Sequence, residues 1–124
     1  KDLINYIIEL PEVAGNKRIK VFRGNLREFL ISISGAELYI GMDSSGAHIA
    51  ASFKIHTIVI FGPAEPKLCR PIGNSVKTIS LSKHLDCRPC NQITCTNSVY
   101  QRCYKELDIS QEIIKNYSSF QHEK

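Results

Sequence analysis

The sequence has no long apolar run and no targeting leader. Its best uninterrupted apolar candidate, residues 57–61, has the length of a strand, whereas a membrane helix needs about 18 such residues. Seven glycines and five prolines do not make a collagen-like or disordered composition. These absences predict an ordinary soluble chain whose 124 residues form one domain. Because it begins at Lys1 rather than at methionine, we expect a piece of a longer protein.

The charge of the chain is mildly positive, with 16 Lys and Arg against 12 Asp and Glu and a formal net charge of +4. Five basic residues cluster near the amino end: Lys17, Arg18, Lys20, Arg23 and Arg27. Such a run is either a solvated face or a surface for an anionic ligand or a membrane. Nucleic acid is not an expected partner, because the run has little aromatic interleaving and fits no nucleic-acid-binding signature.

Apolar spacing predicts alternating helices and strands. A helix begins at residue 3 and stops before Pro11, and another follows a cap at Asn25 and closes at Gly35. A last helix begins with a cap at Ser110 and buries the residues Ile113, Ile114, Tyr117 and Phe120. The strands are expected from Arg18 to Gly24 and at residues 38–42, 57–61 and 76–81. This alternation predicts a three-layer α/β domain with a parallel sheet.

The most informative stretch is residues 38–51, which we interpret as strand, tight turn and helix. Gly41 and Gly46 allow close backbone approach, and the alanines that follow let the helix lie tightly on the sheet. The turn is a helix amino terminus, where unpaired N–H groups and the helix dipole suit a phosphate. In open α/β sheets ligands bind at this end of a strand.

Four cysteines lie in one irregular segment, residues 87–103. Cys87, Cys90, Cys95 and Cys103 are spaced so that four thiolates can close on zinc, and Cys69 is left over. The wide gap before Cys103 weakens that pattern. Free structural thiols, zinc, an iron–sulfur cluster and disulfides all stay open.

Taken together, these motifs resemble the carboxyl-terminal half of family 9 glycosyltransferases, the lipopolysaccharide heptosyltransferases. The similarity covers most of the chain from about Gly24 onward. It rests on an apolar strand at residues 36–41 and on a turn with an acid, hydroxyls, glycine and histidine at residues 43–48. A Phe-Gly-Pro loop at residues 61–66 and a Cys-x-x-Cys pair at residues 87–90 complete the pattern. The chain departs from the pattern at Ser45, His56 and Ala64, where glycine, proline and threonine are usual.

The resemblance implies the GT-B architecture, of which this chain supplies one Rossmann-like half. It implies an inverting, metal-independent transfer of heptose from ADP-heptose to a lipopolysaccharide core acceptor. The amino-terminal half, with the acceptor contacts and the catalytic base, is expected to be missing, so the chain alone is expected to be inactive. A cytoplasmic location, peripheral on the inner face of the membrane, is implied as well, and it disfavours disulfides.

The resemblance also assigns donor-binding roles, each with a plainer alternative. The amides of Ser44, Ser45, Gly46 and Ala47 would neutralise the leaving phosphate. Asp43 binds sugar hydroxyls or merely caps the helix. His48 binds a phosphate or the sugar, or is a buried core histidine. Phe22 and Arg23 line the nucleobase pocket or belong to a surface loop.

Two other classes of function remain. The chain is a zinc-stabilised interaction domain if the cysteines are its functional centre and the turn is only structural. It is a flavodoxin-like phosphate or cofactor binder if the turn holds a ligand without transferring a sugar.

Overall fold

A computed structural model of the chain describes residues 3–90 and 94–122. Its sheet has three parallel strands in the order β1 (Leu38–Met42), β2 (His56–Phe61) and β3 (Val76–Ser80). The register places Met42 opposite Ile60, and Ile60 opposite Ile79. The central strand is buried on both faces, which explains its continuous β-branched and apolar sequence.

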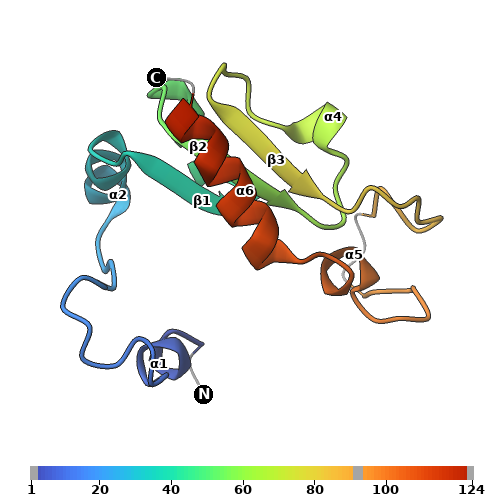
Figure 1. The fold of residues 1–124 in the computed structure, drawn as a ribbon, viewed down its shortest axis with the longest axis horizontal. Helices are drawn as coiled ribbons and strands as arrows, with labels where there is room; N and C mark the ends of the chain where they lie inside the picture. Colours follow the sequence, from blue (N-terminus) through green and yellow to red (C-terminus); the bar gives the residue numbers. More distant parts are fainter. Residues whose placement is uncertain (1–2, 91–93, 123–124) are drawn as a thin grey trace.

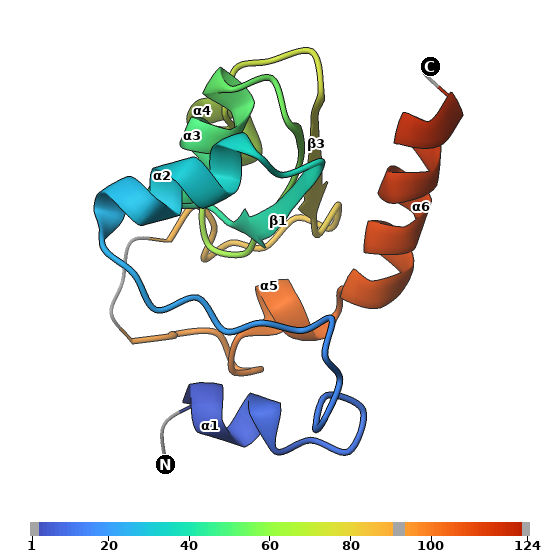
Figure 2. The ribbon, with the colours of Figure 1, turned by 90° about the vertical axis from the view of Figure 1, so that its left-hand side faces the viewer.

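Helices cover both faces of this sheet. Figure 2 shows α2 (Leu26–Ser34) and α3 (Ser45–Ser52) on one side and α6 (Ile109–His122) on the other. Beneath α6 lies a core cluster made of Ile58, Ile60, Ile79 and Phe120. Beneath α3 a second cluster contains Ala47, Val59 and Phe61. The prediction of a three-layer α/β domain is confirmed.

The amino end of α2 forms as its local sequence predicts. The Asn25 side chain accepts a hydrogen bond from the Glu28 amide at 3.0 Å, and the Glu28 carboxylate accepts one from the Asn25 amide at 2.8 Å. This reciprocal capping box satisfies two amides that the helix itself leaves unpaired. Gly35 ends the helix, as expected.

The strand expected from Arg18 to Gly24 does not form, so that prediction is wrong. The chain forms α1 (Leu3–Ile8), which Figure 1 shows away from the sheet, and then an irregular connection up to α2. Ile19 and Val21 alternate as a strand would, but they stay 47% and 41% exposed. A strand needs a hydrogen-bonded neighbour, and β1 pairs only with β2 among the described residues.

The buried face of α6 differs from the predicted one. Its cap is Asp108, whose carboxylate accepts a hydrogen bond from the Gln111 amide at 3.1 Å, not Ser110. Phe120 is buried and Ile113 packs beside it, as expected. Ile114 and Tyr117 are instead 58% and 45% exposed, because the helix meets the sheet along a narrower stripe.

Two short helices appear where the sequence predicted loops. They are α4 (Pro66–Cys69), which begins with proline at its first turn after a cap at Glu65, and α5 (Arg102–Lys105). Neither contributes a buried residue. Within the described ranges, no helix is long and apolar enough to cross a membrane.

Candidate functional site

The turn between β1 and α3, residues 43–48, lies at the carboxyl end of the sheet. Ser44 is the residue before the helix, with extended backbone and no capping bond from its hydroxyl. Its carbonyl accepts a hydrogen bond from the Ala47 amide at 3.1 Å, so that amide is occupied. The amides of Ser45 and Gly46 donate to no acceptor among the described residues, as expected for a first helical turn. Three of the four predicted phosphate-binding amides, those of Ser44, Ser45 and Gly46, therefore have no acceptor among the described residues.

The glycines of this region make room for a tyrosine rather than for a ligand. A side chain added at Gly41 or at Gly46 would overlap the ring of Tyr39, which lies across both. Gly46 is consequently buried, whereas Ser44 and Ser45 remain exposed. The expected close approach at Gly46 is correct, but its partner is the protein's own aromatic ring.

Asp43 and His48 are exposed, and neither forms a hydrogen bond or an ion pair within the described part of the chain. The alternative of Asp43 as a plain helix cap is wrong, because Ser44 occupies that position. The alternative of His48 as a buried core histidine is wrong as well. Both side chains are available to a ligand, and their donor-binding roles stay predictions.

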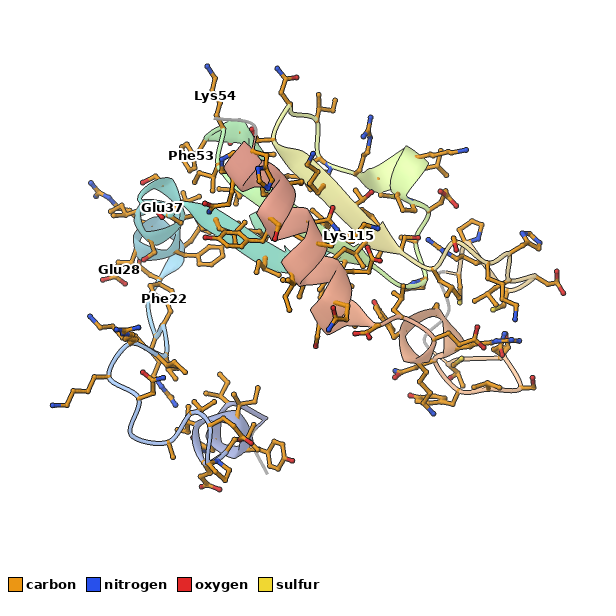
Figure 3. The ribbon with its side chains drawn as sticks, in the orientation of Figure 1. Phe22, Glu28, Glu37, Phe53, Lys54 and Lys115 are labelled. Atoms are coloured by element: carbon orange, nitrogen blue, oxygen red, sulfur yellow. The ribbon has the colours of Figure 1, made fainter. Side chains whose placement is uncertain are left out.

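Phe22 and Arg23 lie ahead of α2. Figure 3 shows Phe22 next to Glu28 at the start of that helix. The Phe22 ring centroid stands 5.9 Å from that of Phe29, and the ring covers Gly24. Phe22 therefore packs locally while remaining 47% exposed, and nucleobase binding by this pair stays a prediction.

The cysteine-rich segment, residues 87–103, is tied to the carboxyl edge of the sheet. The Cys90 amide donates to the Pro63 carbonyl at 2.9 Å, just beyond β2. Beyond β2, the Arg88 guanidinium donates a hydrogen bond to the Ala64 carbonyl at 3.1 Å. At the end of β3, the same guanidinium donates to the Leu81 carbonyl at 2.9 Å and to the Ser80 hydroxyl at 2.6 Å. One arginine thus joins the segment to two strand ends, and Figure 1 shows the strand arrowheads directed toward this region.

Tyr104 follows the segment and reaches the backbone at the end of β2. A side chain built on Gly62 would overlap the Tyr104 ring, so the ring lies on the backbone immediately after β2. Burial raises the pKa of the Tyr104 hydroxyl above its ordinary value, and the charges of Cys103 and Asp43 raise this pKa further. Asp43 is therefore near enough to interact electrostatically with Tyr104. The hydroxyl is protonated at neutral pH and can donate a hydrogen bond.

Sequence reasoning missed Tyr104 for a physical reason. More than forty residues separate it from Gly62, and no motif or spacing connects the two. The sequence alone allows the cysteine-rich segment to be a rival functional centre. In the structure it is instead a neighbour of the turn, at the same edge of the sheet.

The four clustered cysteines surround one hollow of about 140 Å³. The Asn97 side-chain amide donates to the Cys87 sulfur at 3.4 Å, and the Gln101 backbone amide donates to the Cys95 sulfur at 3.3 Å. Burial raises the pKa of the Cys103 thiol, and the nearby thiols of Cys95 and Cys87 contribute to the rise.

Among the residues that the structure describes, no group of three or more His, Cys, Asp or Glu side chains is placed to hold a metal ion. A zinc ion would require the cysteine-rich segment to contract around it, so the zinc site stays a prediction. Cys69 lies apart from this hollow, against the core cluster of Val59 and Phe61. The described cysteines are all free thiols.

Comparison with known proteins finds heptosyltransferases among the relatives of this chain. The chain is 30% identical over 104 residues to lipooligosaccharide heptosyltransferase 2 of Campylobacter jejuni serotype O:2, covering 80% of this chain and 32% of that protein. It is 29% identical over 80 residues to lipopolysaccharide heptosyltransferase 1 of Pseudomonas aeruginosa, covering 64% of this chain and 22% of that protein. The chain thus spans about a third or less of the length of these relatives. No solved structure gives a significant match.

The family model described as glycosyltransferase family 9 (heptosyltransferase) matches residues 22–101, which include β1, the turn, β2 and most of the cysteine-rich segment. The parallel three-layer domain agrees with a Rossmann-like half of the GT-B fold. The chain therefore belongs to glycosyltransferase family 9, the heptosyltransferase family.

Proposed function

We propose that this chain is the donor-binding half of a glycosyltransferase that takes heptose, or a related sugar, from an ADP-sugar. The observation that carries the proposal is the start of α3, where the amides of the exposed residues Ser44 and Ser45 have no acceptor among the described residues. Beside them stand the exposed and unpaired side chains of Asp43 and His48. Open amides and a helix dipole favour a diphosphate, and a carboxylate favours sugar hydroxyls.

The chemistry follows from where charge develops. When the bond between sugar and diphosphate breaks, negative charge grows on the leaving phosphate. Amides that already face this phosphate stabilise the charge without reorganising. His48 donates a hydrogen bond to a phosphate oxygen, while Asp43, an anion itself, accepts hydrogen bonds from the sugar. No metal ion or cofactor is needed in this scheme.

Transfer with inversion also needs an acceptor and a base. We propose that the acceptor is a lipopolysaccharide core and that the second half of a GT-B enzyme supplies both the acceptor site and the base. The matched part covers 32% of the Campylobacter relative and 22% of the Pseudomonas relative, so each relative is at least about three times as long as that part. On this proposal the chain binds the donor but does not complete the reaction alone.

An exposed basic cluster supports a membrane-proximal location in the cytoplasm. Lys17, Arg18, Lys20 and Arg23 are exposed on the connection from α1 to α2, and Arg27 is exposed in the first turn of α2. Positive charge of this kind attracts anionic lipid headgroups. We propose that it holds the enzyme peripherally at the inner face of the membrane, where a lipid-linked acceptor is found.

A structural zinc ion in the cysteine-rich segment is a second proposal. It is supported by the shared hollow of the four cysteines and by two N–H donors to their sulfurs. Such donors stabilise metal-bound thiolates. Metal analysis of purified protein should find one zinc per chain, which Cys87→Ser should abolish and Cys69→Ser should not. Absence of zinc after purification without chelators would contradict this proposal.

Calorimetric titration tests the donor site. ADP should bind the protein, and His48→Gln should weaken both ADP and the ADP-sugar, each by about tenfold, which corresponds to about 1.4 kcal/mol. Asp43→Asn should weaken the ADP-sugar and leave ADP unchanged, because Asp43 serves the sugar. His122→Gln, at an exposed position in α6, and Asp86→Asn, at an exposed position in the turn before the cysteine-rich segment, are the matched controls. No measurable ADP binding, or zinc binding without ADP binding, would favour the interaction-domain reading.

A further inference from the structure

We propose that Tyr104 is a further donor-binding residue, whose hydroxyl donates a hydrogen bond to the diphosphate of the nucleotide sugar. The inference rests on the proposed donor site. It adds to that site a residue from the far side of the cysteine-rich segment.

The Tyr104 ring lies at the carboxyl end of the central strand β2. Tyr104 lies against the backbone of Gly62, the residue that follows β2. β1 and β2 are parallel neighbours with Met42 opposite Ile60, and continuing this register places Ser44 opposite Gly62. The ring that covers Gly62 is therefore adjacent to the turn from which the open amides of α3 project.

The ring is also firmly held. Tyr104 packs against the core cluster of Ile58, Ile60, Ile79 and Phe120. The short helix α5 that carries it follows a segment anchored by Arg88 and by the Cys90 amide. A side chain fixed on a rigid support presents its polar end at little further entropic cost.

The hydroxyl has no protein partner in the described part of the chain. None of the described residues hydrogen-bonds to the Tyr104 oxygen, and this oxygen is not among the buried unsatisfied atoms, so solvent or a ligand reaches it. A protonated phenol beside open amides extends the same set of hydrogen-bond donors toward an anionic ligand.

The diphosphate is the part of the donor that fits this placement. A phenol and two amides are all donors, and phosphate oxygens are only acceptors. Asp43, the acceptor of the group, serves the sugar. Arg88 lines the same hollow as Tyr104, but its hydrogen bonds to Ala64, Ser80 and Leu81 commit it to the protein.

The test compares ADP with AMP in calorimetric titrations of Tyr104→Phe. Loss of one hydrogen bond to a charged phosphate should weaken ADP about tenfold. AMP, which lacks the second phosphate, should be weakened about twofold or less. The melting temperature should not change, because the phenylalanine ring still covers Gly62. The matched control is Tyr100→Phe, since Tyr100 is 59% exposed and lines the same hollow.

The outcomes separate the two proposals. If the wild-type protein binds ADP and Tyr104→Phe binds it equally well, the role of Tyr104 is overturned and the donor site stands. If Tyr104→Phe weakens AMP and ADP equally, contact with the second phosphate of the diphosphate is overturned. If the wild-type protein binds neither nucleotide, the donor site itself fails, and the Tyr104 proposal fails with it.

Discussion

The ring of Tyr104 lies on the backbone of Gly62, and this contact joins the cysteine-rich segment to the carboxyl edge of the sheet. Gly62 is buried directly after the central strand. Only a residue without a side chain leaves space for the ring there. The contact therefore decides both the packing of the segment and the composition of the proposed donor site.

Replacing Gly62 with alanine should destabilise the protein. The added methyl group overlaps the Tyr104 ring, and overpacking of this kind costs about 1–3 kcal/mol in the free energy of unfolding. Urea denaturation measures the change. Gly35→Ala is the control, because the nearest atom to a methyl group there is 3.9 Å away, and it should change the free energy by less than about 0.5 kcal/mol. Equal effects of both variants would contradict the close contact.

Adjacent isoleucines in α6 distinguish the observed helix face from the predicted one. Ile113 packs against the core cluster, so Ile113→Ala should cost about 2 kcal/mol in stability. Ile114 is 58% exposed, so Ile114→Ala should cost less than about 0.5 kcal/mol. Thermal and urea denaturation of the two variants provide the comparison. Similar losses at both positions would show that α6 is rotated from the orientation described.

Arg88 should stabilise the fold through its hydrogen bonds. The Arg88→Ala variant loses four bonds to three acceptors, two of them backbone carbonyls, and should be less stable by about 2 kcal/mol. Arg88→Lys should recover only part of this, since a lysine cannot reproduce the planar fork. The exposed Arg70 is the control, and Arg70→Ala should leave the urea midpoint unchanged. An unchanged midpoint for Arg88→Ala would contradict the anchoring role.

Stability should fall at alkaline pH. Burial raises the pKa values of Cys103 and Tyr104 above 9.0 and 10.0, their ordinary values. A group whose pKa is higher in the folded chain stabilises the fold fully below its unfolded pKa, and this contribution is lost as pH rises through the folded pKa. The urea midpoint should therefore drop between about pH 8 and about pH 11. The urea midpoint of Tyr104→Phe should drop less over this pH range than that of the wild type, and the midpoint of Tyr100→Phe should drop as much as that of the wild type. The same drop in all three proteins would refute the contribution of Tyr104.

The local patterns predicted most of the secondary structure correctly. The capping pair Asn25 and Glu28, the apolar run of β2 and the turn after β1 all act over a few residues, so spacing and residue type suffice to find them. The pattern at Ile19 and Val21 was equally regular, yet no strand forms there. Alternation is only half of what a strand requires, because the other half is a partner with free backbone groups.

What the amino-acid sequence alone determined is the order of helices and strands, the parallel α/β class and the position of the turn, since these follow from periodicity and caps. The tertiary structure alone decided that Tyr39 fills the space over Gly46, that Ile114 faces outward, and that Tyr104 reaches Gly62. These contacts join residues on different elements, or depend on how one element is rotated against another. Such relations arise only when side chains of definite shape pack together, and no spacing along the chain encodes them.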